Sequence, residues 1–393
     1  MKKEGGPASL KRIIEESRRE TIELLQALVR IRSTNPPGGE EEIARYIKDY
    51  LNASEVEAEL VPLEEGRSSV VGRLPGREKG SIVLCGHIDT VEVSEERWTK
   101  PPFEGLIENG RLYGRGASDM KGGVAVILEA AKLLNRAKRP LKKALLLALT
   151  ADEEQDYRGA ETLVERGYFD DAVFMIVAEP TDGQVFLGEK GELWLRARFL
   201  GKAAHGSTPD LGVSALLPAA AFCIRLNSEA SKLPEIEGLG KTTLNIGRFR
   251  AGRRVNIVPD QAEVELDFRV ISEEDKERAI GLVKELGEEG ARKAGAEFEW
   301  ETMSYHPPVF SDRDDGYVRE FLAAAGEPTP ESEAGIAPYC TDAATIVPKV
   351  PIPFVIYGPG SISLAHRPDE YVELDSLGRA LRVLLTFLEG TLL

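Results

Sequence analysis

Short segments of consecutive apolar residues alternate with helical stretches over most of this 393-residue chain. Residues 143–150 and 173–178 are the strongest of these segments, and neither holds more than one charged residue. Successive side chains of a β-strand point to opposite faces, so a strand that is apolar throughout must be covered on both faces. We therefore predict an α/β fold in which a sheet lies between two layers of helices, giving three layers.

The apolar spacing places the elements of this domain in two separate parts of the chain. We predict strands at residues 70–74, 81–85, 143–150, 173–178 and 353–357. We predict helices at residues 8–31, 41–51, 121–134, 159–165, 314–325 and 374–388.

The middle of the chain differs, because its strands alternate between apolar and polar residues. The predicted order is a strand (192–200), a helix (213–227), two strands (242–249 and 262–270), a helix that ends near residue 293 and a last strand (296–301). Ser272 and Asp275 have the spacing of a variant capping box at the start of the second helix. The order β-α-β-β-α-β is typical of a ferredoxin-like domain. We predict that residues 190–304 form this domain, inserted between parts 1–189 and 305–393 of the first.

Composition excludes several classes of partner. The chain has 50 Lys and Arg against 66 Asp and Glu, so its formal net charge is −16. Nucleic acids and anionic membranes need a positive surface, so neither is an expected partner. No apolar segment approaches the roughly 20 residues of a membrane span, and no secretory signal is visible. Cys85, Cys223 and Cys340 are odd in number and far apart, which favours a reducing cytoplasm over a disulfide framework.

Only four His occur in the chain, and two of them stand beyond predicted strands and near acids. His87 follows the strand 81–85, and Asp89 lies on the same side of an extended chain. Such a carboxylate fixes the tautomer of a metal-binding imidazole, although a loop histidine with a surface hydrogen bond is the simpler explanation of this motif alone. His366 follows the last predicted strand and a Gly-Pro-Gly turn.

Asp119 lies in the glycine-rich segment 114–123, just before a predicted helix. The glycine spacing fits neither a P-loop nor a dinucleotide-binding fingerprint. Two roles remain open for Asp119: it is the N-cap of the helix, or its two carboxylate oxygens bridge a pair of divalent cations.

Further acids follow the two strongest apolar segments. Asp152, Glu153 and Glu154 come closely after the first segment, and Glu179 directly follows the second. Adjacent carboxylates are usually a solvated surface, but ligands bind outside the carboxyl ends of strands in an α/β sheet. Two imidazoles and several carboxylates, with no thiolate, suit zinc, cobalt or manganese.

Five motifs follow one another along the chain. They are Gly-His-Ile-Asp-Thr (86–90), Gly-Arg-Gly-Ala-Ser-Asp-Met-Lys-Gly-Gly (114–123), Asp-Glu-Glu (152–154), Glu-Pro-Thr (179–181) and Ala-His-Arg-Pro-Asp-Glu-Tyr (365–371). Together they resemble the dinuclear-metal amidohydrolases, a family that includes acetylornithine deacetylase, succinyl-diaminopimelate desuccinylase, aminoacylase and glutamate carboxypeptidase. The resemblance covers nearly the whole chain. It implies a catalytic α/β domain with an inserted ferredoxin-like lid, through which members of the family often dimerise.

The resemblance also implies two divalent metal ions, with Zn²⁺ expected and Co²⁺ or Mn²⁺ as alternatives. One ion would be held by His87, Asp119 and Glu179. The other would be held by Asp119, Glu154 and His366, so that Asp119 and a water or hydroxide bridge the pair.

The same resemblance implies how the remaining site residues act. Glu153 would be the general base that takes a proton from the bridging water, and Asp89 would orient a metal-binding His. His205 would donate a hydrogen bond to the oxyanion, from the partner subunit in dimeric members. Asn256 and Arg269 match positions that contact the substrate carboxylate, although Arg269 could instead decorate a polar strand face.

Two neighbouring residues of the C-terminal part have different expected roles. Thr341 resembles a residue that borders the family's site and would hydrogen-bond the substrate. Cys340 is expected to be a small buried hydrophobe.

We therefore expect a metal-dependent deacylase that cuts the amide bond of an N-acylated amino acid and forms a homodimer through its lid. Residues 358–371 most resemble acetylornithine deacetylase, which makes N-acetylornithine the leading substrate. N-succinyl-diaminopimelate is the second candidate, and a dipeptidase or broader aminoacylase activity is the third. A non-catalytic amino-acid-binding homologue is the alternative from another class, but it would have lost a metal ligand or the base, and all of them are present here.

Overall fold

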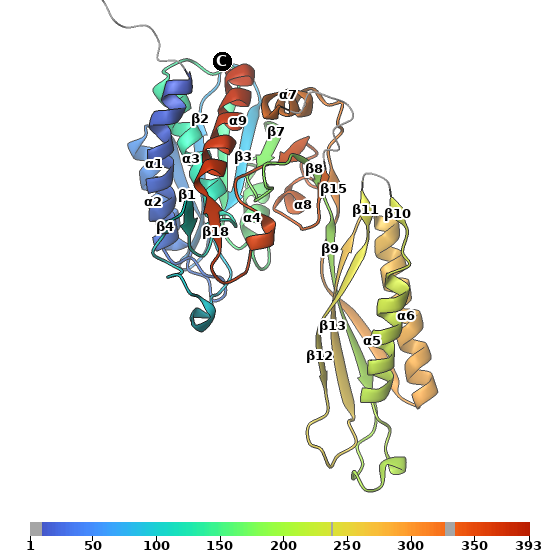
Figure 1. Ribbon diagram of the computed structural model, residues 1–393. Coiled ribbons are helices and arrows are strands. Elements are labelled where there is room, and N and C mark those ends of the chain that lie inside the picture. The colour runs from blue at the N-terminus through green and yellow to red at the C-terminus, as the bar shows by residue number, and fades with distance from the viewer. Residues whose placement is uncertain (1–9, 237–238, 327–334) are drawn as a thin grey trace, which may run out of the picture. The chain divides into compact units, whose positions relative to one another are not determined.

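The computed structural model describes residues 10–236, 239–326 and 335–393, and these form two compact units (Figure 1). The first unit takes its described residues from 1–188, 310–335 and 341–393, and the second from 189–309 and 336–340. The second unit continues beyond residue 304, because the last strand of its sheet extends to His306.

Among the described residues, nine strands form a mixed sheet, and most of this sheet belongs to the first unit. These strands are β1 (Glu57–Glu64), β2 (Arg67–Leu74), β3 (Ser81–His87), β6 (Ala144–Thr150), β7 (Ala172–Val177), β8 (Phe186–Glu189), β15 (Val309–Phe310), β16 (Gly335–Ala337) and β17 (Phe354–Ile356). They lie in the order β1-β2-β6-β3-β7-β17-β8-β15, and β16 pairs with β8. The neighbours β6, β3, β7 and β17 are parallel, whereas β1, β2 and β8 run antiparallel to their partners.

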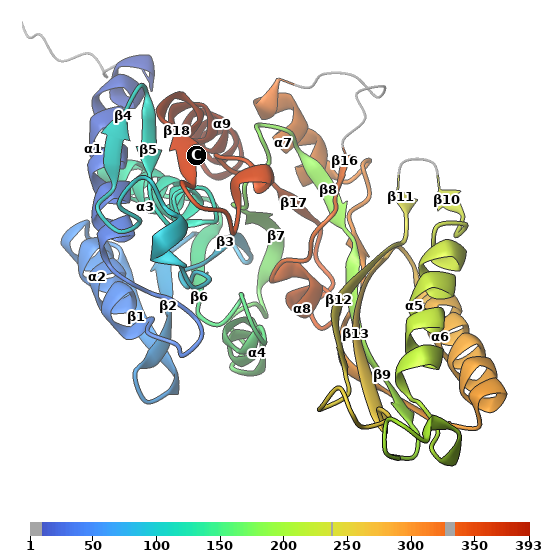
Figure 2. The ribbon, with the colours of Figure 1, turned by 60° about the horizontal axis from the view of Figure 1, so that its bottom comes forward.

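Helices cover both faces of this sheet. They are α1 (Leu10–Arg30), α2 (Glu41–Ala53), α3 (Lys121–Arg136), α4 (Arg158–Glu165), α7 (Gly316–Ala325), α8 (Ala343–Ile346) and α9 (Leu374–Leu392), with single 3₁₀ turns η1 (Glu95–Arg97) and η3 (Ile362–Leu364). α1, α3 and α9 pack against one another on one face, while α4 and α8 contact each other on the other face (Figures 1 and 2). The predicted three-layer α/β architecture is therefore confirmed.

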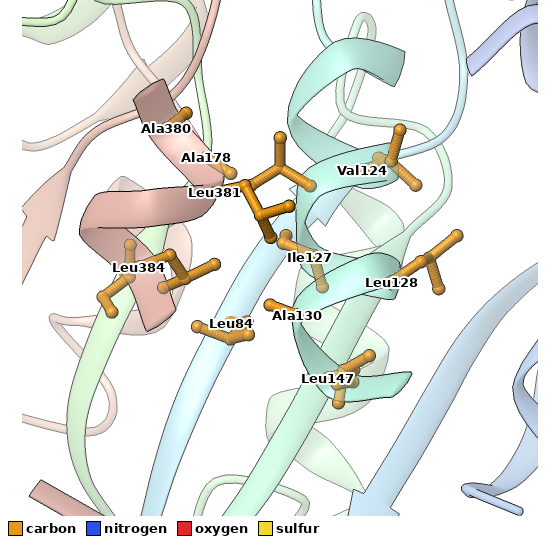
Figure 3. Packing of buried hydrophobic residues seen from close by; sticks show 14 of the residues in the cluster. Leu84, Val124, Ile127, Leu128, Ala130, Leu147, Ala178, Ala380, Leu381 and Leu384 are labelled. Carbon is orange, nitrogen blue, oxygen red and sulfur yellow. The ribbon is translucent and has the colours of Figure 1, made fainter. Parts of the chain in front are cut away.

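The central strand β6 shows why its sequence is apolar throughout. Leu145, Leu147 and Leu149 belong to the cluster beneath α1, α3 and α9, whereas Leu146 and Ala148 are buried outside this cluster. In Figure 3, Ile127 and Ala130 of α3 face Leu84 of β3, and Leu381 and Leu384 of α9 lie beside them.

The second unit is a four-stranded antiparallel sheet with two helices on one face (Figure 2). Its elements are β9 (Gly191–Leu200), η2 (Pro209–Leu211), α5 (Leu216–Ala230), β10 (Glu235–Ile236), β11 (Gly240–Lys241), β12 (Thr243–Ala251), β13 (Gln261–Val270), α6 (Glu273–Ala294) and β14 (Glu297–His306). The sheet order β12-β13-β9-β14 is that of the predicted ferredoxin-like fold. We call this unit the lid.

Alternation along the lid strands separates an apolar face from a charged one. Leu193, Leu195, Ala197 and Phe199 of β9 are buried with residues of α5 and α6. On the opposite face Arg196 forms ion pairs of 3.2 Å and 2.8 Å with Glu265 of β13 and Glu301 of β14. These ion pairs join neighbouring strands, so they balance the charges on the sheet face opposite α5 and α6.

Half of the predicted capping box is present at the start of α6. The Ser272 side chain accepts a hydrogen bond of 3.1 Å from the backbone N–H of Asp275. The carboxylate of Asp275 binds the hydroxyl of Thr242 (3.0 Å) and the guanidinium of Arg278 (3.0 Å) instead of returning to the N-cap.

Several strands were absent from the sequence prediction. β1 carries three Glu and Pro62 on an edge of the sheet, so it lacks an apolar pattern. The strands β4 (Leu106–Glu108), β5 (Arg111–Tyr113) and β18 (Tyr371–Glu373) form a separate small sheet and are too short to show a periodicity. Residues 8 and 9 of the first predicted helix lie outside the described residues. None of the helices in the described parts of the chain is both long and apolar enough to cross a membrane.

Two helical glycines of the first unit give a matched test of this packing. A Cβ at Gly123 of α3 would lie 2.0 Å from the carbonyl oxygen of Ala178, whereas no described atom outside its own helix lies within 4 Å of a Cβ at Gly378 of α9. We expect Gly123→Ala to lower the free energy of unfolding by about 1–3 kcal/mol. Gly378→Ala should raise it by up to about 1 kcal/mol. Urea unfolding of both variants measures this, and equal effects would contradict the close approach of α3 to the sheet.

Candidate metal centre

The carboxyl ends of three parallel strands meet at one edge of the central sheet. In the register of the sheet His87 of β3 lies beside Thr150 of β6, and Cys85 of β3 lies beside Val177 of β7. Because β3 ends at His87, the acids that follow β6 and β7 come to the same edge. This is the edge at which α/β sheets bind ligands.

His87 is almost fully buried and lies among three carboxylates. Its Nε2 is 3.2 Å from Asp119 Oδ1, 3.6 Å from Glu179 Oε1 and 3.9 Å from Glu153 Oε2. These residues come from the ends of β3 and β7 and from the segments before α3 and after β6. The structure therefore brings together His87, Asp119 and Glu179, which were predicted to hold one metal ion.

His366 reaches the other side of the same carboxylate. Its Nε2 is 3.4 Å from Asp119 Oδ2 and 3.0 Å from Glu154 Oε2. Asp119 thus presents one oxygen to each imidazole, which suits a ligand that bridges two cations. The N-cap of α3 is Met120, so the alternative of Asp119 as the N-cap is wrong.

A bound divalent cation explains the grouping of these nitrogen and oxygen atoms better than contacts within the protein do. Ligand atoms of His87, Asp119 and Glu154 lie within 4.8 Å of one another. Glu154 Oε1 is buried and has no hydrogen-bond partner among the described residues, which a buried carboxylate oxygen rarely tolerates. Two imidazole nitrogens and four carboxylate oxygens, of which Asp119 supplies two, are also within the usual repertoire of zinc, cobalt and manganese.

The pKa shifts of these residues also reflect an excess of negative charge at this edge of the sheet. Burial raises the pKa of Glu153, Glu154 and Glu179. Burial alone would lower the pKa of His87, but the charges of Glu153 and Glu179 raise it well above its ordinary value. Bound cations would stabilise these carboxylates in their charged form.

The buried carboxylate of Asp89 contacts the backbone N–H groups of Glu153 and Glu154 and the ring of His87. Its Oδ1 accepts from the backbone N–H of Glu153 (3.2 Å), and its Oδ2 accepts from that of Glu154 (3.1 Å). Its Oδ1 also lies 3.6 Å from His87 Nδ1, and its backbone oxygen lies 3.0 Å from the same atom. Asp89 therefore orients both the histidine and the acidic turn after β6.

The first of the three consecutive acids points elsewhere. Asp152 has φ +69° and pairs with Arg67 (2.7 Å) and Arg158 (2.6 Å). The side-chain N–H₂ of buried Asn35 donates to both Asp152 (2.9 Å) and Asp89 (3.0 Å). These contacts balance the charge of Asp152 and leave the two following Glu to the centre. Sequence reasoning missed Asn35 and Arg67, because nothing in their local sequence marks a buried polar role.

In the lid, His205 and Asn256 lie together and Arg269 lies apart. The backbone N–H of Gly206 donates to the carbonyl of Asn256 (2.8 Å), next to a bridge between His205 and Ile257. Arg269 is near the far end of β13, and the eight steps of extended strand from Gln261 to Arg269 span roughly 26 Å. A single lid therefore keeps Arg269 well away from the other two residues.

Arg269 is already paired within the lid. Its guanidinium lies 3.1 Å from Glu192 and 3.0 Å from Asp267. In the exposed His205, Nδ1 lies 2.7 Å from Ser207 Oγ and accepts a hydrogen bond from the backbone N–H of Ser207 (3.2 Å), which leaves Nε2 as the ring nitrogen that can donate elsewhere.

Thr341 and Cys340 are both buried. The hydroxyl oxygen of Thr341 accepts a hydrogen bond from the backbone N–H of Ala343 (3.1 Å), and Cys340 Sγ lies 3.9 Å from Glu189. The neighbouring Asp342 is buried, and its Oδ2 accepts a hydrogen bond from the hydroxyl of Thr150 (2.5 Å). Burial raises the pKa of Asp342 to about 6.

Metal removal tests the donor set directly. A cation that binds only the folded chain stabilises it by about 2.7 kcal/mol at 100 times its Kd. We therefore expect the thermal midpoint of chelator-stripped protein to rise when Zn²⁺ is restored. Asp119→Asn should lose most of this rise, because the Asp119 carboxylate lies between His87 and His366.

The exposed Asp375, which pairs with Arg18 at the surface, supplies the control. Asp375→Asn should keep the full rise. An equal Zn²⁺ response of Asp119→Asn and Asp375→Asn would contradict the shared carboxylate.

Known proteins resemble this chain over nearly its full length. It is 28% identical over 389 residues to a protein named probable succinyl-diaminopimelate desuccinylase from Staphylococcus epidermidis, with 91% of this chain and 94% of the relative covered. It is 29% identical to an acetylornithine deacetylase from Vibrio atlanticus, with 90% and 93% covered.

Solved structures share the fold. A tripeptidase from Staphylococcus aureus superposes with a TM-score of 0.79 at 22% identity, covering 95% of this chain and 98% of that one. A dinuclear metal-binding peptidase of family M20 from Bacillus subtilis superposes with a TM-score of 0.72 at 20% identity, with 95% and 98% covered.

The sequence pattern of peptidase family M20/M25/M40 matches residues 83–390. This range begins in β3 and includes every proposed metal ligand described above. The chain therefore belongs to peptidase family M20/M25/M40.

Proposed function

We propose that this protein hydrolyses the amide bond that joins an acyl group to the amino group of an amino acid. The observation that carries the proposal is the position of Glu153. Its Oε2 lies 3.9 Å from His87 Nε2, the atom that is 3.2 Å from Asp119 Oδ1, while the adjacent Glu154 contacts His366 (3.0 Å). A carboxylate in that position can accept a proton from a water held at the centre without binding a metal ion itself.

We assign the ligands as the family resemblance implies. His87, Asp119 and Glu179 would hold one divalent ion, and Asp119, Glu154 and His366 would hold the other. When bound, such an ion pair supplies Lewis acidity that activates a water and polarises a carbonyl.

The chain's own residues then move and stabilise charge. Glu153 accepts the proton of the attacking water and delivers it to the departing amine, a role typically worth about 10²–10⁴-fold in rate. His205 donates from Nε2 to the oxyanion, which agrees with the hydrogen bond that its Nδ1 accepts from Ser207. Asp89 keeps His87 and the backbone of Glu153 in place.

The substrate carries a carboxylate in this proposal. Arg269 offers a planar guanidinium that suits bidentate contact with a carboxylate, and Asn256 and Thr341 complete the contacts. The names of the two sequence relatives agree with an N-acyl amino acid. N-acetylornithine is the first candidate and N-succinyl-diaminopimelate the second, while the structural relative named a tripeptidase supports a peptide as the third.

The separation of Arg269 from His205 within one lid favours a homodimer. A span of roughly 26 Å exceeds the length of an acyl amino acid, so one lid does not place both residues on one substrate. We propose that Arg269 serves the site of its own subunit while His205 and Asn256 serve that of the partner.

Removing the base tests the catalytic role. Glu153→Ala should leave two bound metal ions, measured by elemental analysis, and lower kcat by about 10²–10⁴-fold. Glu389→Ala, which changes a carboxylate near the end of α9, is the control and should keep the parent kcat. Substantial activity of Glu153→Ala would remove Glu153 from this role.

A substrate panel tests the reaction class. We expect Zn²⁺-, Co²⁺- or Mn²⁺-loaded enzyme to release amino acid from N-acetylornithine faster than from N-succinyl-diaminopimelate or dipeptides. Arg269→Met should raise KM by about 10-fold or more, because the substrate carboxylate would lose a hydrogen bond from a charged group. Binding without hydrolysis of every acyl amino acid and peptide would instead indicate a non-catalytic binding protein.

Mixed dimers test the division between subunits. Glu153→Ala and His205→Ala are each expected to be nearly inactive. If His205 serves the partner's site, a mixture of the two variants forms heterodimers with one intact site and recovers part of the activity. No recovery, or a monomer in sedimentation, would contradict the proposed division.

A further inference from the structure

The loops that carry Asp119 and His366 are far apart in the chain, yet they meet at one position. Glu370, four residues beyond His366, is fully buried and lies against the Asp119 loop. Its Oε1 accepts hydrogen bonds from the backbone N–H groups of Ser118 (2.9 Å) and Asp119 (3.1 Å). A single carboxylate oxygen thus fixes the peptide groups that lead into the bridging ligand.

The second carboxylate oxygen of Glu370 is engaged elsewhere. Oε2 pairs with the guanidinium of Arg115, which is 3% exposed and lies over the Trp98 ring at 5.3 Å from its centroid. The backbone oxygen of Glu370 accepts from the N–H of Gly114 (2.9 Å), where β18 pairs with β5. The contacts on both oxygens mark Glu370 as a support of the centre and not as one of its metal ligands.

We propose that Glu370 is a positioning residue that joins the Asp119 loop to the segment of His366 and so preassembles the second metal site. The proposal rests on the ligand roles assigned above. Charge-assisted hydrogen bonds to backbone N–H groups are about twice as strong as neutral ones. Residues that orient metal ligands in this way typically contribute about 10–100-fold to metal affinity.

A pair of double variants separates the effect of the Glu370 acceptor on metal affinity from the effect of breaking the buried Arg115–Glu370 ion pair. Breaking a buried ion pair on one side alone is strongly destabilising, whereas replacing both partners is often tolerated. Arg115→Met with Glu370→Gln keeps an acceptor for the two backbone N–H groups. Arg115→Met with Glu370→Met removes that acceptor at similar volume.

The readout is Co²⁺ binding to the metal-free chain, followed by visible absorption. We expect the double variant that carries Glu370→Gln to bind two Co²⁺ ions nearly as the parent does. The double variant that carries Glu370→Met should bind the second ion about 10–100-fold more weakly while keeping a similar thermal midpoint without metal. Equal affinity of the two double variants for both ions would overturn the proposal.

Two further variants make the result decisive. Glu129→Gln alters another fully buried carboxylate, which pairs with Lys132 (2.6 Å) and Tyr50 (3.0 Å) in the middle of α3, and should keep both Co²⁺ affinities. If the double variants do not fold, Glu370→Asp retains the charge beside Arg115 but shortens the reach to the backbone. Unchanged Co²⁺ affinity of Glu370→Asp would also overturn the proposal. Because no substrate is present, an error in the proposed substrate leaves this result unaffected.

Discussion

The Asp119 carboxylate between two imidazoles is the interaction on which the rest of the site depends. One oxygen faces His87 and the other faces His366, and each imidazole also approaches a Glu. So many acids near two histidines would repel one another in a buried setting unless cations were present. The fold brings these groups together because the parallel strands β6, β3 and β7 end at one edge, where α3 also begins.

Around this centre, buried carboxylates hold the backbone. Asp89 accepts from the N–H groups of Glu153 and Glu154, and Glu370 accepts from those of Ser118 and Asp119. In each case an acid that is not itself a proposed ligand fixes the peptide groups that lead to one. This arrangement explains why acids recur in the motifs beyond the number that two metal ions require.

The strong apolar segments predicted the central strands and the three layers, because burial on both faces leaves a continuous signal in the sequence. The ligand set depended on the family resemblance, since each motif alone was explained as well by a surface loop or an N-cap. The supports Asn35, Arg67 and Glu370 could not be predicted as such, because their partners lie far away in the chain and their own neighbours show no periodicity. The separation of His205 from Arg269 likewise depends on the register of β13 with β9, because His205 follows the end of β9 that pairs with Gln261 and Arg269 lies near the opposite end of β13.

The most direct test of the account is anomalous diffraction from crystals of the Zn²⁺-loaded protein, recorded on both sides of the zinc edge. We expect two zinc ions that share the Asp119 carboxylate, one also bound by His87 and Glu179 and the other by Glu154 and His366. A single ion, or a pair of ions in which Asp119 binds only one, would contradict it.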